Sequence, residues 1–560
     1  MSLGTFSRAS SLHALRNHTF DVVIIGGGIT GAGAALDAAS RGLRTALIEK
    51  DDFASGTSSK SSKMIHGGIR YIQHGDIKLV YEALAERQRL LSNAAHLVRE
   101  LPFLIPILSK DGLFPRKAAT GLGSALWIYD MTGGARIGKL HKKLSPDEVL
   151  DSFPGLHRKN VAGGYLYYDA AADDARLTLT LARTAALDHG ATVVNGVRVT
   201  ALNDLQYGHR TVTVEADGET FDVTTRCIVN ATGVWADQVR NLDDPAAAPS
   251  IRPAKGTHIV IPRSLVQLDV ATVLPVKGDK RSVFLVPWGE QIYIGTTDTD
   301  YDGPIDNPTI TREDIKYLLH GVNNMSQLKL TIDDITGTWA GLRPLVSTAS
   351  TDTKVAKTAD LSRRHRVDVS ANGLITVTGG KLTTYRDMAA DTIDQAVDQL
   401  GDDNLPFSRR CRTRKLKLRG STQLVDALKL LREHPLLDEA DAVHLLGRFG
   451  SECGIIAAMI DNDPTLAGRL DPELPYLRVE VQYVARHEMV RTLDDILSRR
   501  LRARIRNWKA TARIAPVVAK LVADDLGWDD ATQASQVDDF IQSLHSEATG
   551  AALPGAVLPT

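Results

Sequence analysis

The chain has 560 residues, of which 43% are hydrophobic, enough to build a large core and about two to four domains. Its 66 Lys and Arg residues balance 67 Asp and Glu residues, and the net charge of −1 gives no overall attraction to nucleic acid. Cys227, Cys411 and Cys453 lie far apart and show neither a disulfide framework nor zinc-site spacing. We therefore expect a reducing, cytosolic compartment and no metal site.

Residues 1–19 contain no apolar signal core, and no run of about 18 or more apolar residues occurs. We expect neither a secretion signal nor a membrane-spanning helix. No calcium-binding loop of the D-x-D-x-D-G type is present either, so calcium control is not expected.

The first predicted unit, residues 20–50, joins an apolar strand, a glycine turn, a small-residue helix and a second strand. Gly26, Gly28 and Gly31 form the G-x-G-x-x-G pattern, which permits a tight turn, close approach of a diphosphate and close helix–strand packing. Glu49 ends the second strand, where a carboxylate can accept hydrogen bonds from an adenosine ribose. The combination predicts bound FAD or NAD. The alternative is a glycine-rich turn in a domain without a cofactor.

A serine-rich segment follows at residues 55–62. Its hydroxyl and N–H groups can bind a diphosphate without adding charge; a flexible polar loop is the alternative. Residues 76–99 carry apolar side chains at helical spacing and predict an amphipathic helix. Residues 101–108 contain two prolines and cannot form a regular helix.

Residues 115–143 combine an apolar core, residues 122–129, with basic flanks. Trp127 and Tyr129 suit a membrane interface, and basic flanks are attracted to anionic headgroups. The segment predicts a lipid-facing element. The alternative is a buried helical hairpin over the substrate domain.

The remaining elements follow in chain order. Residues 174–189 predict a helix, and residues 191–202 and 210–232 predict strands. Residues 251–300 are rich in β-branched residues with Gly and Pro between them, which is typical of an antiparallel sheet. A strand at 373–379 and a helix at 382–400 come next, then a basic linker at 410–419 and a mostly helical region at 422–545.

Two further strand-to-helix turns resemble the first in composition. One contains the small residues 231–233, and the other contains the glycine pair 379–380 followed by threonines at 383 and 384. Small residues let the backbone approach a cofactor closely. Three such turns in this order favour an FAD fold over an NAD domain.

The chain resembles the FAD-dependent (respiratory, aerobic) glycerol-3-phosphate dehydrogenases. The most specific motifs are HGGIRY at 66–71 and GGKLTTYR at 379–386, which simple amino-acid oxidases do not share. The resemblance extends over most of the chain, through GGGITGAG at 26–33, the serine-rich stretch 54–87, YYDAAADDARLTLTLARTAALDHGA at 167–191, KGTHIVIPR at 255–263, GTTDTDYDG at 295–303, GLRPL at 341–345 and RHEMVRTLDDILSRR at 486–500.

The resemblance implies an α/β (α+β overall) fold: a glutathione-reductase-like FAD-binding Rossmann domain, an antiparallel-sheet substrate domain and an all-α C-terminal domain. We assign residues 1–100, 150–250 and 340–405 to the discontinuous FAD-binding domain. Residues 101–149 and 251–339 form the predicted substrate-binding and membrane-facing domain, and residues 406–560 the helical cap.

The resemblance and the glycine turns together imply a set of residues that contact FAD. These are Ile25, Gly26, Gly28, Ile29, Thr30, Gly31, Glu49, Lys50, Thr57, Ser58, Ser61, Ser62, Ile65, His66, Gly67, Val199, Ala231, Thr232, Gly233, Trp235, Gly379, Gly380, Lys381, Leu382, Thr383 and Thr384.

The implied substrate is sn-glycerol 3-phosphate, whose dianionic phosphate suits the planar, permanently charged fork of arginine. The implied substrate ligands are Arg70, Tyr71, Arg343, Arg363 and Lys381. Arg363 lies in a variable stretch, so Arg364 or Arg366 could hold that role instead.

The implied catalytic residues are His66, His258, Arg343 and Lys381. The reaction transfers a hydride from C2 to flavin N5 while the C2 hydroxyl loses a proton, and histidine is a suitable base near neutral pH. His66 and His258 are both candidates. Lys381 is placed to favour an anionic reduced flavin, or to act as the base itself.

The resemblance implies that electrons pass to a membrane quinone, and hence a peripheral (monotopic) protein on the cytoplasmic face of the cell membrane, against the inner-leaflet lipid surface, or a cytoplasmic protein when detached. It also allows a homodimer. The alternatives are a glycerol-3-phosphate oxidase that uses oxygen, an amino-acid or amine oxidase of the same fold, and a non-catalytic FAD-bound scaffold. The last is disfavoured by Arg70, Arg343 and Lys381.

Overall fold

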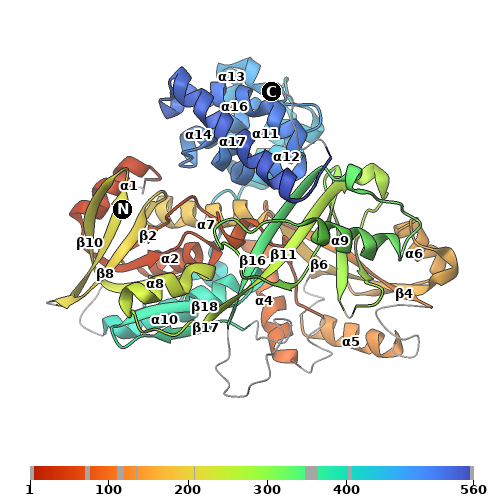
Figure 1. Ribbon diagram of the computed structural model, residues 1–560, viewed down its shortest axis with the longest axis horizontal. Helices are drawn as coiled ribbons and strands as arrows, with labels where there is room; N and C mark the ends of the chain where they lie inside the picture. The colour runs from red at the N-terminus through yellow and green to blue at the C-terminus, as the bar shows by residue number, and fades with distance from the viewer. Residues whose placement is uncertain are drawn as a thin grey trace.

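The computed structural model describes residues 5–69, 76–109, 119–133, 137–206, 208–279, 281–346, 364–401 and 407–554. Two β-sheets form the body of the molecule, and the C-terminal helices pack together across one end of it (Figure 1). Helix α5 (Ala119–Met131) lies at the opposite end.

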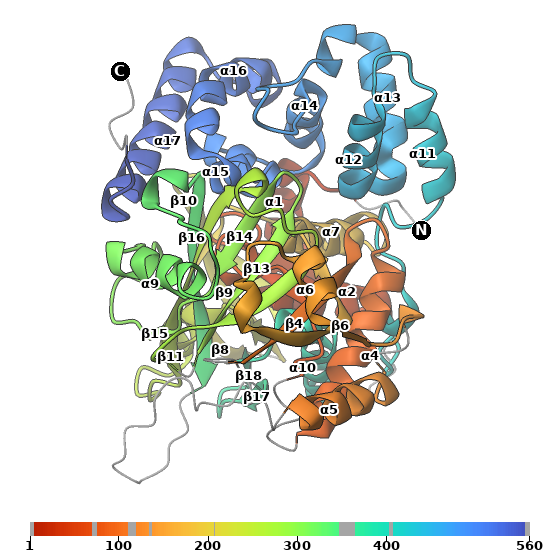
Figure 2. The same ribbon diagram turned by 90° about the vertical axis from the view of Figure 1, so that its right-hand side faces the viewer.

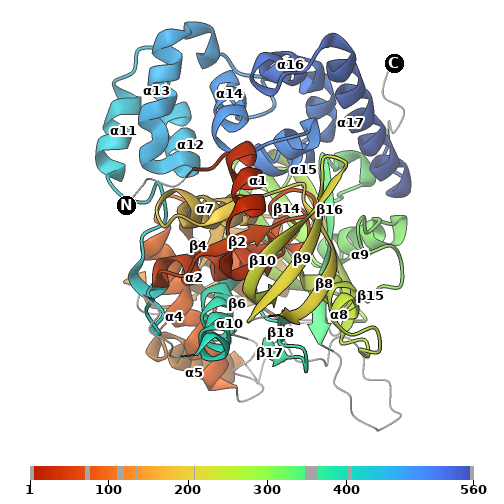
Figure 3. The same ribbon diagram turned by 90° about the vertical axis from the view of Figure 1, so that its left-hand side faces the viewer.

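The first sheet has the order β17-β18-β10-β1-β2-β7. Strands β18, β10, β1, β2 and β7 run parallel, and β8 and β9 extend β10 as an antiparallel ribbon (Figure 3). The bounds are β1 (Phe20–Ile25), β2 (Thr45–Ile48), β7 (Thr192–Val194), β8 (Arg198–Gln206), β9 (His209–Ala216), β10 (Glu219–Asn230), β17 (Arg366–Val369) and β18 (Leu374–Thr378).

Both faces of this sheet are covered, which explains why β1 is apolar at nearly every position. Val22 and Ile24 belong to one core cluster, shared with the helices α2, α7 and α10. Val23 and Ile25 belong to a second cluster on the other face, shared with α1 and α8. The bounds are α1 (Arg8–Asn17), α2 (Ile29–Arg41), α7 (Asp174–Leu187), α8 (Ala236–Asp243) and α10 (Tyr385–Leu400).

The second sheet is mostly antiparallel, as the residues 251–300 predict, and has the order β15-β11-β14-β13-β12-β4-β6-β3, with β16 beside β11 and β5 beside β6. Its strands are β3 (Met64–Ile65), β4 (Val98–Leu108), β5 (Lys142–Leu144), β6 (Val161–Ala172), β11 (Ile251–Pro262), β12 (Ala271–Pro275), β13 (Ser282–Trp288), β14 (Gln291–Gly295), β15 (Thr299–Asp300) and β16 (Gly337–Val346). Its helices are α4 (Ile77–Asn93), α5, α6 (Pro146–Ser152) and α9 (Arg312–Asn323), of which α5 and α9 lie at its periphery (Figure 2).

The proline-rich segment 101–108 is a strand, in agreement with the prediction that it is not a helix. Strand β4 pairs along its length with β6, but with β12 only at Phe103 and Leu104. Proline lacks the N–H that a strand between two neighbours must donate. Pairing with β12 is therefore confined to the positions between Pro102 and Pro106.

The C-terminal region is helical, as predicted. It contains α11 (Leu424–Arg432), α12 (Glu439–Phe449), α13 (Cys453–Asn462), α14 (Arg478–His487), a π-helix (Asp495–Arg500), α15 (Ala503–Arg506), α16 (Trp508–Leu526) and α17 (Asp530–Gly550). Its core joins residues of the second sheet, among them Ile259 and Ile294, in one apolar cluster.

One helical stretch in the described residues, Glu439–Asn462, is long and apolar enough to cross a membrane by length and composition alone. It consists of α12 and α13, separated by a 3-10 turn at Gly450–Glu452. Leu445, Phe449 and Ile456 from this stretch are buried in the C-terminal core. A core helix of a soluble domain meets the same criterion, so the stretch is weak evidence for a span.

The predicted fold class is confirmed. The sheets, however, do not follow the predicted domain boundaries at every strand. β3 and β6 come from ranges assigned by sequence to the FAD-binding domain, yet both pair within the second sheet. The chain thus passes between the two sheets more often than the predicted domain ranges imply. The ranges themselves stay a prediction.

Candidate functional site

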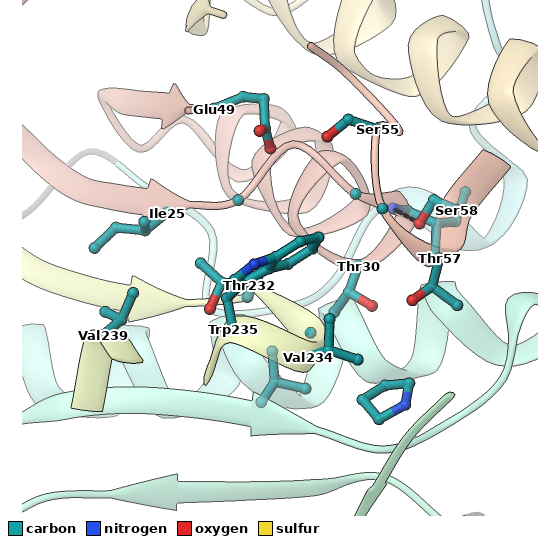
Figure 4. A pocket seen from close by; sticks show the side chains of 18 of the residues that line it. Ile25, Thr30, Glu49, Ser55, Thr57, Ser58, Thr232, Val234, Trp235 and Val239 are labelled. Atoms are coloured by element: carbon teal, nitrogen blue, oxygen red, sulfur yellow. Dashed lines mark hydrogen bonds between the residues drawn. The ribbon is translucent and has the colours of Figure 1, made fainter. Parts of the chain in front are cut away.

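A cavity of about 340 Å³ lies at the carboxyl ends of β1, β2, β10 and β18 (Figure 4). Because these strands are parallel, their carboxyl ends meet at one edge of the sheet, which is where ligands bind in open α/β sheets. Figure 4 shows Glu49 and the loop carrying Ser55, Thr57 and Ser58 on one side, with Thr232 and Trp235 facing them.

The glycine turn after β1 leaves no room for side chains. Gly26 has φ +109°, and a Cβ there would lie 2.7 Å from the Ala231 oxygen. A Cβ on Gly31 would lie 1.9 Å from the Gly26 oxygen. These contacts bring the turn against the 231–233 turn and open the N-terminus of α2 toward the cavity, where backbone N–H groups can bind a diphosphate.

The serine-rich segment packs on this helix N-terminus. The Ser58 hydroxyl accepts a hydrogen bond from the Ile29 N–H at 2.8 Å, and the Thr57 hydroxyl donates to the Leu342 oxygen at 2.6 Å. Of the two readings of this segment, the described geometry therefore favours an ordered loop that lines the cavity over a flexible one.

Glu49 lies at the end of β2 and is fully enclosed. Its carboxylate accepts hydrogen bonds from the Gly27 N–H at 2.6 Å and the Asp51 N–H at 2.8 Å. Burial, assisted by the charges of Asp51 and Asp52, raises the pKa of Glu49 to about 7. The carboxylate thus helps to close the glycine turn while it faces the cavity.

Trp235 crosses the cavity and is held by two polar residues. Its indole N–H donates to Asp306 at 2.8 Å, and the Lys50 ammonium lies 4.5 Å from the ring centroid. Lys50 also pairs with Asp306 at 2.6 Å. A Cβ on Gly56 would lie 2.7 Å from the ring, so the serine-rich loop packs directly on the indole.

Most residues predicted to contact the cofactor line this one cavity. They are Ile25, Gly26, Gly28, Ile29, Thr30, Glu49, Lys50, Thr57, Ser58, Ser61, Val199, Ala231, Thr232, Gly233, Trp235, Gly379, Gly380, Lys381 and Leu382. The remaining predicted residues, Gly31, Ser62, Ile65, His66, Gly67, Thr383 and Thr384, do not line it. Gly31 acts by packing, and the threonine Thr383 bonds the backbone of His66 at 3.2 Å.

Further lining residues escaped the sequence analysis: Ile48, Ser55, Gly56, Val197, Arg198, Val234, Gln238, Val239, Leu242, Pro344, Val377 and Met388. Ser55 and Gly56 belong to the recognised serine-rich segment, and Val197 and Arg198 adjoin Val199, so adjacency to a motif was a usable signal for these. Val239 and Leu242 lie on helix α8, and Met388 lies on α10. Which face of each helix points toward the cavity is determined only by the fold.

A polar cluster borders the cavity on the side of the second sheet. Arg343, next to the cavity-lining Pro344, donates to Asp298 at 3.0 Å and to Thr296 at 3.1 Å. A Cβ on Gly256 would lie 2.5 Å from the Arg343 guanidinium, so this glycine makes room for it. The antiparallel register of β16 on β11 brings Arg343 and Gly256 together.

His258 is buried in an aromatic environment on β11. Its ring stacks on Trp339 at 4.6 Å, and Nε2 lies 2.9 Å from the Ser62 hydroxyl. Nδ1 has no hydrogen-bond partner among the residues that the structure describes. Burial, and then the charges of Lys63 and Arg343, hold the pKa of His258 well below its usual range, so the imidazole is neutral at pH 7.

The other predicted substrate and catalytic residues have different outcomes. Arg70, Tyr71 and Arg363 lie outside the described residues. Arg364 pairs with Asp76 at 2.9 Å at the surface, and Arg366 pairs with Asp368 at 2.6 Å, also exposed. Neither alternative to Arg363 lines the cavity.

These observations fit the predicted cofactor. A dinucleotide needs a turn without side chains, a helix N-terminus for its diphosphate and an acceptor near its ribose, and the cavity supplies all three. The turns at 231–233 and 379–380 follow β10 and β18, which lie on the side of β1 away from β2 and Glu49, and their small residues line the cavity as far as Lys381.

Comparison with known families gives two matches along the chain. Residues 21–386 match the model of the FAD dependent oxidoreductases. Residues 411–533 match the C-terminal domain of alpha-glycerophosphate oxidase. The second match begins inside the basic linker at 410–419, before the C-terminal helices.

Individual proteins resemble nearly the whole chain. Glycerol-3-phosphate dehydrogenase 2 of Mycobacterium tuberculosis is 40% identical, covering 99% of this chain and 93% of that protein. The human mitochondrial glycerol-3-phosphate dehydrogenase is 38% identical, covering 97% of this chain and 75% of that protein. The structure of the glycerol-3-phosphate dehydrogenase from Bacillus halodurans complexed with FAD is 28% identical, with TM-score 0.77 and coverage of 99% of each chain.

Proposed function

The chain belongs to the family of FAD-dependent glycerol-3-phosphate dehydrogenases, and on that basis we propose that it oxidises sn-glycerol 3-phosphate to dihydroxyacetone phosphate. FAD is its cofactor. The observation that supports the proposal most strongly is that Lys381 lines the dinucleotide cavity and that Arg343 adjoins another lining residue, Pro344.

The residues of the cavity bind and orient the cofactor. When bound, FAD supplies the acceptor for the hydride that leaves C2 of the substrate, at flavin N5. The glycine turn and the N-terminus of α2 would hold the diphosphate, and Glu49 the adenosine ribose. The 379–382 turn follows β18, which β1 and β10 separate from β2 and Glu49 in the sheet, and it would therefore face the flavin.

Arg343 would bind the substrate phosphate. Its guanidinium pairs with Asp298 at 3.0 Å, and about a quarter of the side chain is exposed. It lies at the border between the two sheets, next to the cavity-lining Pro344. An arginine can bind two phosphate oxygens at once, which both holds and orients a small phosphate ester.

His258 would accept the proton of the C2 hydroxyl. The neutral imidazole has a lone pair for this, on Nδ1 if Nε2 donates to Ser62. A bound dianionic phosphate adds negative charge nearby and would raise the pKa of His258 toward the operating pH. His66 stays the second candidate, since its backbone is held against Thr383 next to the Lys381 turn.

Lys381 would stabilise the negative charge that develops on the reduced cofactor, or act as the base if its pKa is lowered. It lines the cavity and follows the glycine pair, whose positive φ angles of +72° and +84° at Gly379 and Gly380 place the turn close to the cavity. A cation held there favours the charge-separated transition state over the neutral ground state.

Electrons would leave to a membrane quinone. The alternative acceptor is oxygen, and it is kept because the C-terminal helices match a domain named for an oxidase. Measuring quinone or dye reduction together with peroxide separates the two: peroxide at the rate of substrate consumption would establish the oxidase.

Contact with the membrane would be made through α5. Trp127 is 54% exposed and Met131 is 76% exposed. Both belong to α5, which lies at the end of the molecule opposite the C-terminal helices (Figure 1). Lys139, Lys142 and Lys143 follow in the sequence, as a basic flank. The proposed location is thus the cytoplasmic face of the membrane, without a span.

The apolar segment 122–129 agrees in part with each of its two interpretations, a lipid-facing element and a buried helical hairpin. Leu122, Leu126 and Tyr129 are buried in the core of the second sheet, as the buried-hairpin alternative expects. Among the described side chains of α5, the exposed large apolar ones are Trp127 and Met131. A lipid contact must therefore use Trp127 and Met131 rather than the buried face.

Anaerobic absorbance of the purified yellow protein tests the substrate. We expect sn-glycerol 3-phosphate to bleach the flavin band, while glycerol and D-amino acids leave it unchanged. Bleaching by a D-amino acid would favour an amino-acid oxidase. An FAD-loaded protein that no polyol phosphate reduces would require the substrate assignment to be withdrawn.

A further inference from the structure

Two arginines of the C-terminal domain reach into the loops that line the cofactor cavity. Arg500 ends the π-helix Asp495–Arg500, and Arg502 follows two residues later. Each side chain is only 2% exposed. Since arginine is almost never fully buried unless it is paired, the partners of these two side chains indicate their role.

Arg502 holds the serine-rich loop. Its Nη2 donates to the Ser59 oxygen at 2.5 Å and to Asp174 Oδ1 at 3.0 Å. Ser59 ends the 3-10 turn Thr57–Ser59, and its two preceding residues line the cavity. One guanidinium therefore joins the cofactor loop to the first turn of α7.

Asp174 is the common acceptor in this arrangement and is fully buried. It also accepts hydrogen bonds from the Ser61 N–H at 3.0 Å, the Ser61 hydroxyl at 2.7 Å and Lys63 Nζ at 3.1 Å. The next residue after Ser61, Ser62, contacts His258. The Asp174 carboxylate thus holds the serine-rich loop at the point between its cavity-lining residues and Ser62, which contacts His258.

Arg500 holds the loop after β2 in the same way. Its two terminal nitrogens form a fork on Asp52, at 2.7 Å and 2.8 Å. Asp52 lies three residues after Glu49, whose carboxylate faces the cavity. Burial opposes ionisation of Asp52, but Arg500 and Arg499 outweigh it and hold the pKa of Asp52 below its usual range.

The backbone conformation of Arg502 also indicates that its side-chain contacts hold the residue in place. Arg502 adopts φ +68°, a left-handed conformation that residues other than glycine rarely take. Such a conformation persists where surrounding contacts determine it. Here the two hydrogen bonds of the side chain to Ser59 and Asp174 supply those contacts.

We propose that Arg500 and Arg502 are positioning residues, through which the C-terminal domain sets the shape of the FAD cavity. They touch neither the cavity nor the proposed substrate, and act through Asp52 and through Ser59 and Asp174. The C-terminal domain is then part of the support of the cofactor site. This inference concerns FAD binding, so it stands or falls independently of the proposed substrate.

The test compares Arg502→Gln with a matched interface variant, Arg183→Gln. Arg183 is also buried, at 6% exposure, and also joins α7 to the C-terminal domain, through Glu452 at 2.6 Å and Tyr483 at 3.2 Å. It makes no contact with the serine-rich loop or Asp52 among those the structure describes. In Arg502→Gln, Asp174 keeps Lys63 as its ion-pair partner, so no buried charge is left alone.

The measurements are the dissociation constant of FAD, from reconstitution of the apoprotein of the full chain, and the visible circular dichroism of the bound flavin. We expect Arg502→Gln to weaken FAD binding by at least about tenfold, the size of one lost charge-assisted hydrogen bond, and to change the flavin dichroism. Arg183→Gln should keep both near wild type, and Arg502→Lys should lie between.

Equal effects of Arg502→Gln and Arg183→Gln on FAD binding would overturn the proposal, because they would reduce the arginines to ordinary interface contacts. An unchanged dissociation constant in Arg502→Gln would overturn it too. If Arg502→Gln does not fold, Arg502→Lys decides: weaker FAD binding than in Arg183→Gln supports the proposal, and equal binding rejects it.

Discussion

The adenosine side and the substrate side of the site are built in different ways. Around Glu49 the cavity is formed by the backbone and small side chains of the glycine turn and the serine-rich loop, which lie close together in the sequence. The border of the cavity near Arg343 and His258 is formed by polar side chains from antiparallel strands, each held by a partner far away in sequence.

The difference shows what each side tolerates. The backbone side depends on shape, since an added methyl group collides with backbone oxygens that cannot move aside. The side-chain side depends on charge and hydrogen-bond geometry, since Arg343 and His258 each act through a hydrogen-bonded polar group. Substitutions should therefore separate cofactor retention on the first side from turnover and substrate affinity on the second.

The largest effect is expected from Gly31→Ala. The new Cβ would stand 1.9 Å from the Gly26 oxygen and would force the glycine turn apart. We expect complete loss of bound FAD, measured as the flavin-to-protein absorbance ratio. Gly121→Ala, where a Cβ meets nothing within 4 Å, is the control and should stay yellow. A yellow Gly31→Ala protein would contradict the shape argument.

Lys381→Met should follow, with an effect on turnover and not on retention. Removing a positioned cation that also is a candidate base should lower kcat by about 10²–10⁴-fold. FAD content should stay near wild type, because the glycine pair before Lys381 keeps the turn. Stopped-flow flavin reduction measures the first and absorbance the second. Equal losses of both would mean that Lys381 only supports the cofactor.

Glu49 makes a pH-dependent contribution to the stability of the apoprotein. Its folded pKa of about 7 lies above the ordinary 4.5, so its stabilising contribution is present below pH 4.5 and is lost as the pH rises through 7. The loss amounts to about 3 kcal/mol in the free energy of unfolding. Denaturant unfolding of the apoprotein at pH 5 and pH 8 should show this loss in wild type and not in Glu49→Gln. If the stability of wild type and Glu49→Gln changed with pH in the same way, the pH dependence could not be assigned to Glu49.

Arg343→Lys should raise the KM for glycerol 3-phosphate by roughly tenfold and leave FAD content unchanged. Lysine keeps the charge but cannot bind two phosphate oxygens in one plane. The matched control is Arg263→Lys, at the end of β11, where the arginine pairs with Asp269 at the surface. A fall in kcat without a change in KM would place Arg343 at the reacting carbon instead of the phosphate.

The smallest effect is expected from the double change Trp127→Glu and Met131→Glu on α5. It should weaken binding to anionic liposomes by a few-fold, since only these exposed apolar side chains are lost. Flavin reduction by substrate should not change. Val425→Glu, 82% exposed on α11 at the other end of the molecule, is the control. Unaltered flotation of the double variant would reject α5 as the lipid contact.

Much of the adenosine side could be predicted because its residues are contiguous. The glycine turn, Glu49 and the serine-rich loop lie within residues 26–62, and each is recognisable from local backbone demands. Val239 and Met388 could not be predicted in this way. They come from helices, and which face of a helix points toward a cavity depends on how that helix packs on the sheet.

The substrate side was predicted only through family motifs, and its predicted arginines lie in different places in the structure. Arg343 lies beside the cavity, whereas Arg364 and Arg366 pair with carboxylates at the surface. The sequence distinguishes Arg343 by its GLRPL motif at 341–345, whereas Arg364 and Arg366 lie in a variable stretch. Registration of β16 on β11 decides that Arg343 lies at the border of the two sheets.

By itself the sequence determined the dinucleotide turn, the class of fold and the family, because these depend on residues close together in the chain. The tertiary structure alone decided that Leu126 faces the core, that β6 joins the second sheet, and that Arg502 reaches Ser59 across 443 positions. Contacts at such separations arise from packing of whole elements on one another, which no local pattern of side chains specifies.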